Sequence, residues 1–339
     1  MGGPAPAEVL LPPALGEDAC AIAIGGGALV AATDPITLTG KEIGGHAVLI
    51  NANDVAVMGV RPRWFLAVVL LPPGTGAAAI EALFADMHGA LERLDVTLVG
   101  GHTEITPAVT QPVVVGQMLG FRDDGRFVRT AGMRAGDVVL QIGPAPVEGA
   151  AVLANEVPQR LEMLPPDLLQ RARAAIRDPG ICIVEPALLA ADLGARALHD
   201  PTEGGLSAGL HELAEAAGLA LLIDPEAVLW FAPGRAVCAA LGADPWGALA
   251  SGCLLAAFPE KGVEEAQTAL AAAGHVSARL GRAEAGSGVR TTAGSRLVRF
   301  EQDEVSRILG RGCATRRSCA PSPDISTREG GRWPRRRSM

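Results

Sequence analysis

Several features that mark whole classes of protein are scarce in this sequence. Tyrosine is absent and aromatic residues make up only 3% of the 339 residues. The chain therefore offers few of the stacking platforms on which single-stranded nucleic acid is bound. The formal net charge of -8 argues the same way, because phosphate contacts need clustered Lys and Arg. We expect no nucleic-acid partner.

Cysteine pairs, long apolar runs and the commonest phosphate-binding loop are missing as well. The six cysteines form no CxxC pair, so their spacing gives no support to a zinc site or a redox pair. No apolar run reaches the roughly 20 residues that span a bilayer, and the first residues lack the features of a signal peptide. No GxxxxGK[ST] motif occurs, which excludes a P-loop enzyme. We expect a cytoplasmic protein with no membrane contact.

The sequence does contain short β-rich runs that alternate with helical stretches. This alternation is typical of an α/β or α+β fold with helices laid on a sheet. In the first half it predicts strands over 19–24 and 28–33, a helix over 44–59, a strand over 64–71, a helix over 75–94, and strands over 96–100 and 113–121. In the second half it predicts a helix over 203–218, a strand over 252–258 and a helix over 261–273.

Composition divides the chain into three parts. A polar, glycine-containing stretch at 129–137 suggests a boundary, giving domains over 1–130 and 131–310. From Arg311 onward there are eight Arg against one Asp and one Glu, with little apolar periodicity. Such a segment cannot bury enough surface to offset the entropy of ordering. We expect 311–339 to be a disordered basic tail, either a binding tail or an unrelated extension.

Four polar motifs interrupt apolar segments: GEDA (16–19), TDP (33–35), NAND (51–54) and GGHTE (100–104). They place carboxylates at or near the ends of strands or inside the first helix, where buried Asn and Asp are costly unless they are paired. Each acid alone is weak evidence, because Asp is also a common turn residue. If they converge, their repulsion needs a cation, and an all-oxygen ligand set favours Mg²⁺, which usually arrives with phosphates. The carboxylates in question are Glu17, Asp18, Asp34, Asp54 and Glu104.

The order and spacing of several motifs resemble those of the aminoimidazole ribonucleotide (AIR) synthase superfamily, whose fold is called PurM-like. The matching segments are GEDACAI, ATDPITLTGKEIGGHAVLINANDVAVMGVRPRWF, LVGGHTEIT, GDVVLQIG, VEGAAVLANE, HDPTEGGLSAGLHELAEAAG and ASGCLLAAF, and together they extend over residues 16 to 305. The nearest resemblance is to AIR-synthase-related and HypE-type hydrogenase maturation proteins. Thiamine-monophosphate kinase and selenophosphate synthetase are more distant members.

The resemblance implies a two-domain fold whose N-terminal domain pairs strands with a second copy, and a cleft that binds ATP and Mg²⁺. It implies a homodimer and a small-molecule or protein-bound acceptor. The residues carried over by position are metal ligands Asp18, Asp34 and Asp54, nucleotide-binding residues Asn53, Gly100, Gly101, His102 and Thr103, and cleft residues His199, Asp200, Thr202 and Glu203. Glu104 is added as a metal ligand on its own carboxylate, and Gly44 and Gly45 are added as nucleotide-binding residues because their backbone N–H groups can hold phosphate. Many relatives have an acid where this chain has His102, so either His102 or Glu104 could contact the metal.

These implications predict an Mg-ATP-dependent enzyme that phosphorylates an amide-type or carbonyl-type oxygen for dehydration or cyclisation. A small-molecule kinase or ligase, and a nucleotide-binding homologue without turnover, are the alternatives. His199 is a candidate for proton transfer or substrate contact, and an equally open interpretation is a hydrogen-bonded structural histidine.

Overall fold

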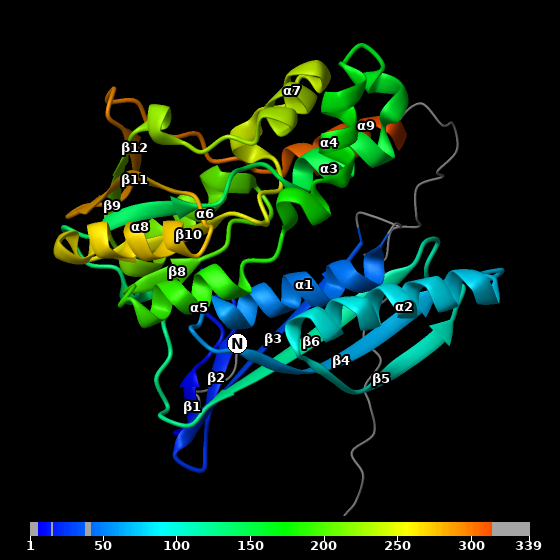
Figure 1. Ribbon diagram of the computed structural model, residues 1–339, viewed down its shortest axis with the longest axis horizontal. Coiled ribbons are helices and arrows are strands. Elements are labelled where there is room, and N and C mark those ends of the chain that lie inside the picture. The colour runs from blue at the N-terminus through cyan, green and yellow to red at the C-terminus, as the bar shows by residue number, and fades with distance from the viewer. Residues whose placement is uncertain (1–5, 15, 38–41, 314–339) are drawn as a thin grey trace, which may run out of the picture.

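The computed structural model describes residues 6–14, 16–37 and 42–313. The chain forms two six-stranded sheets, one in each half, and helices pack on both (Figure 1). The first half contains β1 (Val9–Leu11), β2 (Cys20–Ile24), β3 (Gly27–Ile36), α1 (Ile43–Ala56), β4 (Pro62–Leu71), α2 (Ala77–Leu94), β5 (Thr97–Ile105) and β6 (Val113–Arg122).

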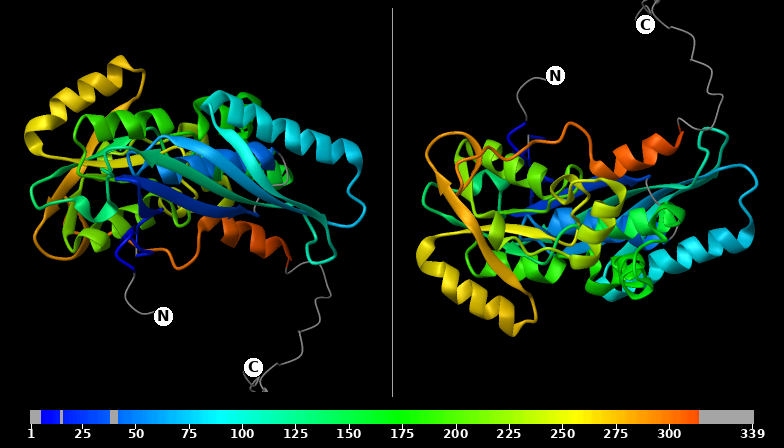
Figure 2. Two further views of the ribbon diagram at one scale, coloured as in Figure 1. Left: turned by 90° about the horizontal axis from the view of Figure 1, so that it is seen from below. Right: turned by 90° about the horizontal axis from the view of Figure 1, so that it is seen from above.

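The second half begins at β7 and ends in a helix that returns toward the middle of the molecule (Figure 2). Its elements are β7 (Val138–Ile142), α3 (Glu148–Glu156), α4 (Pro166–Ala174), α5 (Val184–Asp192), β8 (Ala197–His199), α6 (Gly205–Ala217), β9 (Ala220–Ile223), α7 (Ala232–Leu241), β10 (Leu254–Phe258), α8 (Val263–Ala272), β11 (Ser277–Glu284), β12 (Gly288–Thr291) and α9 (Glu304–Cys313). The α/β class with a sheet in each half is thus confirmed.

The first sheet has the strand order β1-β2-β3-β6-β4-β5, and all its pairs are antiparallel except β4 with β5. Helices α1 and α2 cover one face of this sheet (Figure 1). On the other face the side chains of Trp64, Leu66, Val68 and Leu70 remain only half-buried. This sheet therefore keeps one apolar face that no described helix covers.

The second sheet has the strand order β12-β9-β11-β7-β10-β8. Strands β7 and β10 are buried along their whole length, as expected for central strands covered on both faces. Short β8 pairs with β10 through His199 opposite Leu255. The residues that follow His199 are thereby brought to the side of the second domain that faces α1.

Helix α1 lies between the first sheet and the second domain (Figure 1). Thirteen of its 14 residues are buried, as expected for a helix that is packed on every side. Its polar residues are therefore enclosed by both domains. This single helix positions most of the candidate site.

The expected elements agree with the observed ones to within a few residues. The sheets divide between the end of β6 at Arg122 and the start of β7 at Val138, a gap that contains the proposed boundary at 130. Helix α9 runs to Cys313, so the expected tail overlaps it by three residues. The rest of the expected tail, 314–339, lies outside the described residues. No described helix is long and apolar enough to cross a membrane.

Candidate active site

Four aspartates from separate elements converge where the two domains meet. Asp18 precedes β2, Asp34 lies on β3, Asp54 lies on α1, and Asp200 follows β8. Burial raises the pKa of Asp34 to about 6, with further contributions from the charges of Asp18 and Glu203. The structure thus brings Asp18, Asp34 and Asp54 together and adds Asp200 to them.

The two fully buried aspartates of this cluster show the same effect more strongly. The pKa of Asp54 is raised well above its ordinary value, first by burial and then by the neighbouring charges of Asp200, Asp34 and Asp18. The pKa of Asp200 is raised by burial and by Asp18 and Asp34. Repulsion between carboxylates in a region of low dielectric disfavours their ionised forms. A bound cation would reverse that preference.

Asp200 shows most directly that the residues fit a cation. Both carboxylate oxygens of Asp200 are buried without a hydrogen-bond partner, an arrangement that is costly unless something absent from the chain completes it. No group of three or more His, Cys, Asp or Glu within the described residues is arranged to hold a metal ion unaided. An incomplete carboxylate set suits Mg²⁺, which keeps water and phosphate oxygens in its shell.

His199 is held between two carboxylates. Its Nδ1 lies 3.0 Å from Asp18 Oδ2, and its Nε2 lies 2.9 Å from Glu212 Oε2 on α6. Burial alone would lower the pKa of His199, but Asp18 and Glu212 outweigh that effect and raise it well above its ordinary value. The imidazolium donates from both nitrogens and orients Asp18. Of the two interpretations of His199, the geometry favours the structural one.

The two asparagines of the NAND motif hold other segments onto α1. Asn51 accepts from the Asp34 backbone N–H at 2.8 Å and donates to the Asp34 carbonyl at 3.3 Å. Asn53 donates to the Ile181 carbonyl at 2.8 Å and accepts from the Ile183 N–H at 2.9 Å. Asn51 thus positions an acid of the cluster. Asn53, predicted to bind nucleotide, instead uses its amide to fix a segment of the second domain.

Gly44 and Gly45 allow α1 to pack closely on α2. A Cβ at Gly44 would lie 2.3 Å from the Leu83 carbonyl oxygen, and one at Gly45 would lie 2.8 Å from the Asp86 carboxylate. The Gly45 N–H already donates to Asp86 Oδ2 at 2.6 Å. Close packing of α1 on α2 therefore explains both glycines, and a phosphate contact is not needed to explain them.

The GGHTE motif lies apart from the acid cluster in a single chain. It occupies β5, the edge strand, whose side chains are mostly exposed. His102 Nε2 lies 3.9 Å from Glu104 Oε2, with 66% and 52% of these side chains exposed. Thr103 is exposed beside them. A Cβ at Gly101 would lie 2.1 Å from the Ala67 carbonyl oxygen, whereas one at Gly100 would meet nothing closer than 3.7 Å.

A cavity of about 340 Å³ extends from the acid cluster between the domains. Asp34 and Ile50 line it from the first domain, and Thr202, Glu203 and Ser251 line it from the second. Glu203 is exposed and Thr202 is half-buried, so both are accessible from this space. The cavity can hold a small acceptor beside Asp34.

Sequence reasoning missed several residues that build this region. Glu17, noted only as a possible acid, accepts from the Thr130 N–H at 3.1 Å and joins the first segment to the connection between the two sheets. Glu212 was not considered, although its place on a helix close after HDPTEGG was a usable signal. His46 and Glu148, whose side chains are hydrogen-bonded at 2.8 Å, gave no sequence signal because they are 102 residues apart.

The chain is similar to known protein families and to curated proteins. Residues 16–121 match the family "AIR synthase related protein, N-terminal domain", and residues 134–294 match "AIR synthase related protein, C-terminal domain". The chain is 32% identical to the carbamoyl dehydratase HypE of Rhodobacter capsulatus, with 78% of each chain covered. It is 31% identical to a thiamine-monophosphate kinase of Mycobacterium tuberculosis, with 73% of each covered.

The fold is also found in solved structures. The hydrogenase maturation protein HypE in complex with ATP has a TM-score of 0.68 and 24% identity, with 82% of this chain and 86% of that chain covered. The matches to both family domains, in the order in which the two sheets occur, lead to one conclusion: this chain is a member of the AIR synthase related family.

Proposed function

We propose that this chain binds Mg-ATP between its domains and uses it to phosphorylate the oxygen of a carbamoyl-type acceptor. The observation that carries the proposal is the buried, unpartnered carboxylate of Asp200 among Asp18, Asp34 and Asp54. Phosphoryl transfer needs charge neutralisation and alignment more than covalent chemistry from the protein. An enclosed set of carboxylates meets the first of these needs by holding Mg²⁺ beside the phosphates.

Each group of residues at the site would have a separate role in cation binding, positioning or acceptor contact. Asp18, Asp34, Asp54 and Asp200 would hold the cation, and Mg²⁺ bound there would neutralise the phosphate charge. His199 would keep Asp18 in place through its 3.0 Å contact, and Asn51 would do the same for Asp34. Thr202 and Glu203 would contact the acceptor, since both line the cavity beside Asp34.

The relatives favour a carbamoyl acceptor. The curated relative with 32% identity is named a carbamoyl dehydratase, and dehydration of a carbamoyl group requires its oxygen to become a leaving group. Phosphorylation by ATP provides that leaving group. The 340 Å³ cavity is large enough for such a group at the end of a small molecule or a side chain.

The first test is thermal unfolding with and without Mg-ATP. Ligand at about 100 times its Kd should stabilise the wild type by roughly 2.7 kcal/mol, which corresponds to a Tm increase of a few degrees in a chain of this size. Asp54→Asn should lose this increase because one of the cation's carboxylates becomes neutral. The substitution should leave the fold intact, since Asp54 makes no described hydrogen bond through its carboxylate.

Two controls make this test decisive. ATP with EDTA should give a much smaller shift, and far-UV circular dichroism of Asp54→Asn should match that of the wild type. A folded wild type that shows no Mg-dependent shift would contradict the proposal, as would an undiminished shift in Asp54→Asn.

We also propose a homodimer built on the first sheet. Its uncovered face presents Trp64, Leu66, Val68 and Leu70, and the edge strand β5 leaves Val99 and Ile105 more than half exposed. Apolar patches of this kind mark interaction surfaces. His102 and Glu104 lie apart from the acids of their own chain. In such a dimer they would contact the acid cluster of the partner chain.

A small-molecule kinase is the second candidate function, favoured by the 31% identity to a thiamine-monophosphate kinase. ADP release stimulated by thiamine monophosphate, and not by carbamoyl compounds, would select it. Tight Mg-ATP binding without ADP formation under any acceptor would instead indicate a nucleotide-binding homologue without turnover.

A further inference from the structure

A second polar group lies in the cavity wall, separate from the aspartates. His46 Nε2 lies 2.8 Å from Glu148 Oε1, and Ser251 Oγ donates to Glu148 Oε2. The three side chains come from α1, from the first turn of α3 and from the turn before β10. All three are buried, with 3%, 8% and 0% of the residues exposed. They join the two domains across the cavity.

The ionisation of Glu148 determines that Nε2 of His46 is the hydrogen-bond donor in the contact between these two side chains. Burial alone would raise the pKa of Glu148, but its contact with His46 and the hydrogen bonds from His46 and Ser251 outweigh burial and lower the pKa. An ionised carboxylate only accepts hydrogen bonds, so Nε2 of His46 donates. No described residue is hydrogen-bonded to Nδ1, which leaves this nitrogen available to another molecule.

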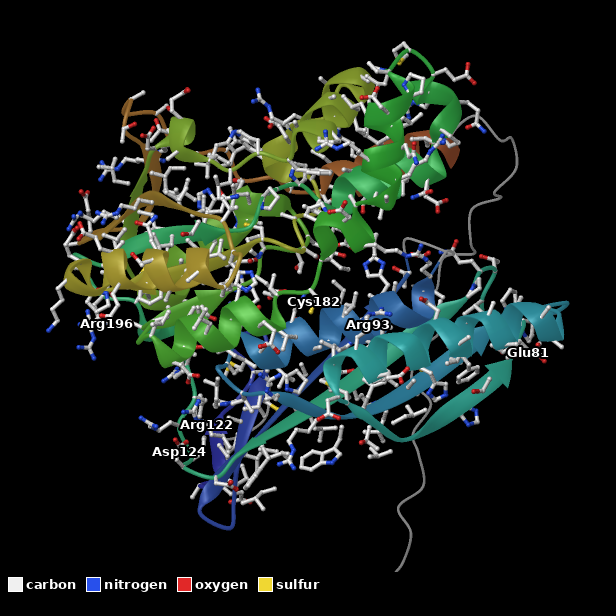
Figure 3. All side chains as sticks on the ribbon, in the orientation of Figure 1. Glu81, Arg93, Arg122, Asp124, Cys182 and Arg196 are labelled. Carbon is white, nitrogen blue, oxygen red and sulfur yellow. The ribbon has the colours of Figure 1, made fainter. Side chains whose placement is uncertain are left out.

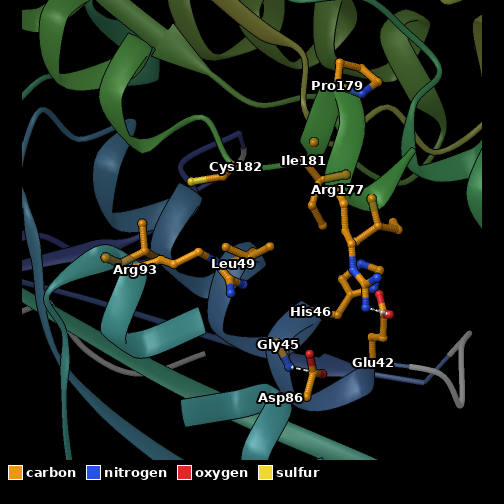
Figure 4. A pocket seen from close by; sticks show the side chains of 13 residues that line it. Glu42, Gly45, His46, Leu49, Asp86, Arg93, Arg177, Pro179, Ile181 and Cys182 are labelled. Carbon is orange, nitrogen blue, oxygen red and sulfur yellow. Dashed lines mark hydrogen bonds and ion pairs between the residues drawn. The ribbon is translucent and has the colours of Figure 1, made fainter. Parts of the chain in front are cut away.

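His46 is also accessible from the spaces around it. It lines the 340 Å³ cavity together with Asp34 and Glu203. It lines a neighbouring cavity of about 490 Å³, where Figure 4 shows it beside the ion pair of Glu42 and Arg177. Glu148 therefore holds the ring, and the ring borders both cavities although only 3% of the residue is exposed.

His199, in contrast, has no ring nitrogen available to another molecule. Both of its ring nitrogens are bonded to carboxylates, those of Asp18 and Glu212. His46 is thus the histidine of the cavity wall with a ring nitrogen that no described residue occupies.

We propose that His46 is the catalytic base that takes a proton from the acceptor, with Glu148 and Ser251 as its positioning residues. This inference rests on the proposed function. The carbonyl oxygen of the carbamoyl group forms a bond to the γ-phosphorus of ATP, and the bond from that phosphorus to the β–γ bridging oxygen breaks. ADP leaves with that electron pair. The amide nitrogen becomes acidic as its carbonyl oxygen is phosphorylated, and the proton it loses passes to Nδ1 of His46.

His46→Gln is the discriminating variant, because the glutamine amide can still donate to Glu148 but offers no basic nitrogen. The probe acceptor is S-carbamoyl-L-cysteine, and the readout is ADP release with Mg-ATP. We expect kcat to fall by roughly 10²- to 10⁴-fold, the usual contribution of general base catalysis. KM for ATP and the Mg-ATP thermal shift should stay unchanged. Added imidazole should restore part of the kcat of His46→Ala, which a purely structural role would not allow.

His88→Gln is the matched control, since His88 is an exposed histidine on α2 and its replacement should change nothing. Wild-type kcat in His46→Gln would overturn the proposal while leaving the Mg-ATP site standing.

A second measurement does not depend on turnover. In ¹⁵N-detected spectra of the wild type with a non-hydrolysable ATP analogue, saturating S-carbamoyl-L-cysteine should shift the Nδ1 resonance of His46. An unchanged Nδ1 resonance would overturn the proposal. Failure of the proposed function would show itself separately, as the absence of any Mg-ATP thermal shift.

Discussion

At the scale of single residues, Asp200 has the least favourable surroundings among the described side chains. Its carboxylate is buried, lacks a hydrogen-bond partner and faces other acids. Unpaired buried charges destabilise folded proteins strongly. On the proposed function a bound cation offsets this cost, which then appears only when the ligand is removed.

Asp200→Asn should therefore stabilise the protein in EDTA and abolish the stabilisation by Mg-ATP. The raised pKa means that the folded state holds its proton to higher pH than the unfolded state does. Stability is accordingly lost as pH rises, and the gain from Asn should be larger at pH 8 than at pH 5.5. We expect a gain of roughly 1–3 kcal/mol at pH 8, measured by urea unfolding. A variant less stable than the wild type at pH 8 would refute this.

At the scale of elements, β5 shows that only one of its two adjacent glycines is required by packing. Gly101 has φ +152° and leaves no room for a Cβ beside the Ala67 carbonyl of β4. Its neighbour Gly100 has no such contact. The two positions form a natural matched pair.

Gly101→Ala should destabilise the first domain by about 2 kcal/mol or more, because it combines overpacking with a backbone conformation that Ala rarely adopts. Gly100→Ala should cost less than about 1 kcal/mol. Urea unfolding of both variants gives the comparison, and equal losses would contradict the packing explanation.

Asp303 links the start of α9 to the loop that follows β8. It accepts from the Gly204 N–H at 2.8 Å and from the Val305 N–H at 2.7 Å. Burial raises its pKa to about 6, although the backbone hydrogen bonds oppose this. The carboxyl therefore loses its proton near pH 3.8 in the unfolded chain and near 6 in the folded one.

The contribution of Asp303 should be most favourable below pH 4 and should weaken as pH rises toward 6. The full change is on the order of 3 kcal/mol, from about 1.4 kcal/mol for each pKa unit. The difference in unfolding free energy between wild type and Asp303→Asn, followed from pH 4 to 7.5, isolates this residue from the other acids. If this difference in unfolding free energy did not vary with pH, the raised pKa of Asp303 would be ruled out.

The sequence was informative where a signal is local. The strand and helix alternation followed from short-range periodicity, and the polar motifs marked Asp18, Asp34 and Asp54 because acids in apolar runs are unusual. Asp200 was indicated only by the family resemblance. What each Asn of NAND does could not be predicted, since their partners are backbone groups of β3 and of residues 181–183. The roles of Gly44 and Gly45 depended on how closely α2 approaches, which no periodicity reveals.

At the scale of the whole molecule, the first sheet leaves its apolar face uncovered. Val68→Asp would place a charge in the proposed dimer interface at the centre of this face. We expect light scattering to give twice 34.7 kDa for the wild type and a single chain mass for the variant. Glu81→Gln, on the exposed surface of α2 (Figure 3), should remain a dimer. A monomeric wild type would rule the interface out.

The link between Asp18 and His199 also has a consequence for synthesis. The two residues are 181 positions apart in the chain, so a ribosome adding about 5–20 residues each second needs roughly 9–36 s to pass from one to the other. During that interval the nascent first domain has three aspartates of the cluster and lacks Asp200. A growing chain would therefore be unable to consume ATP until its second domain had been made and folded onto the first.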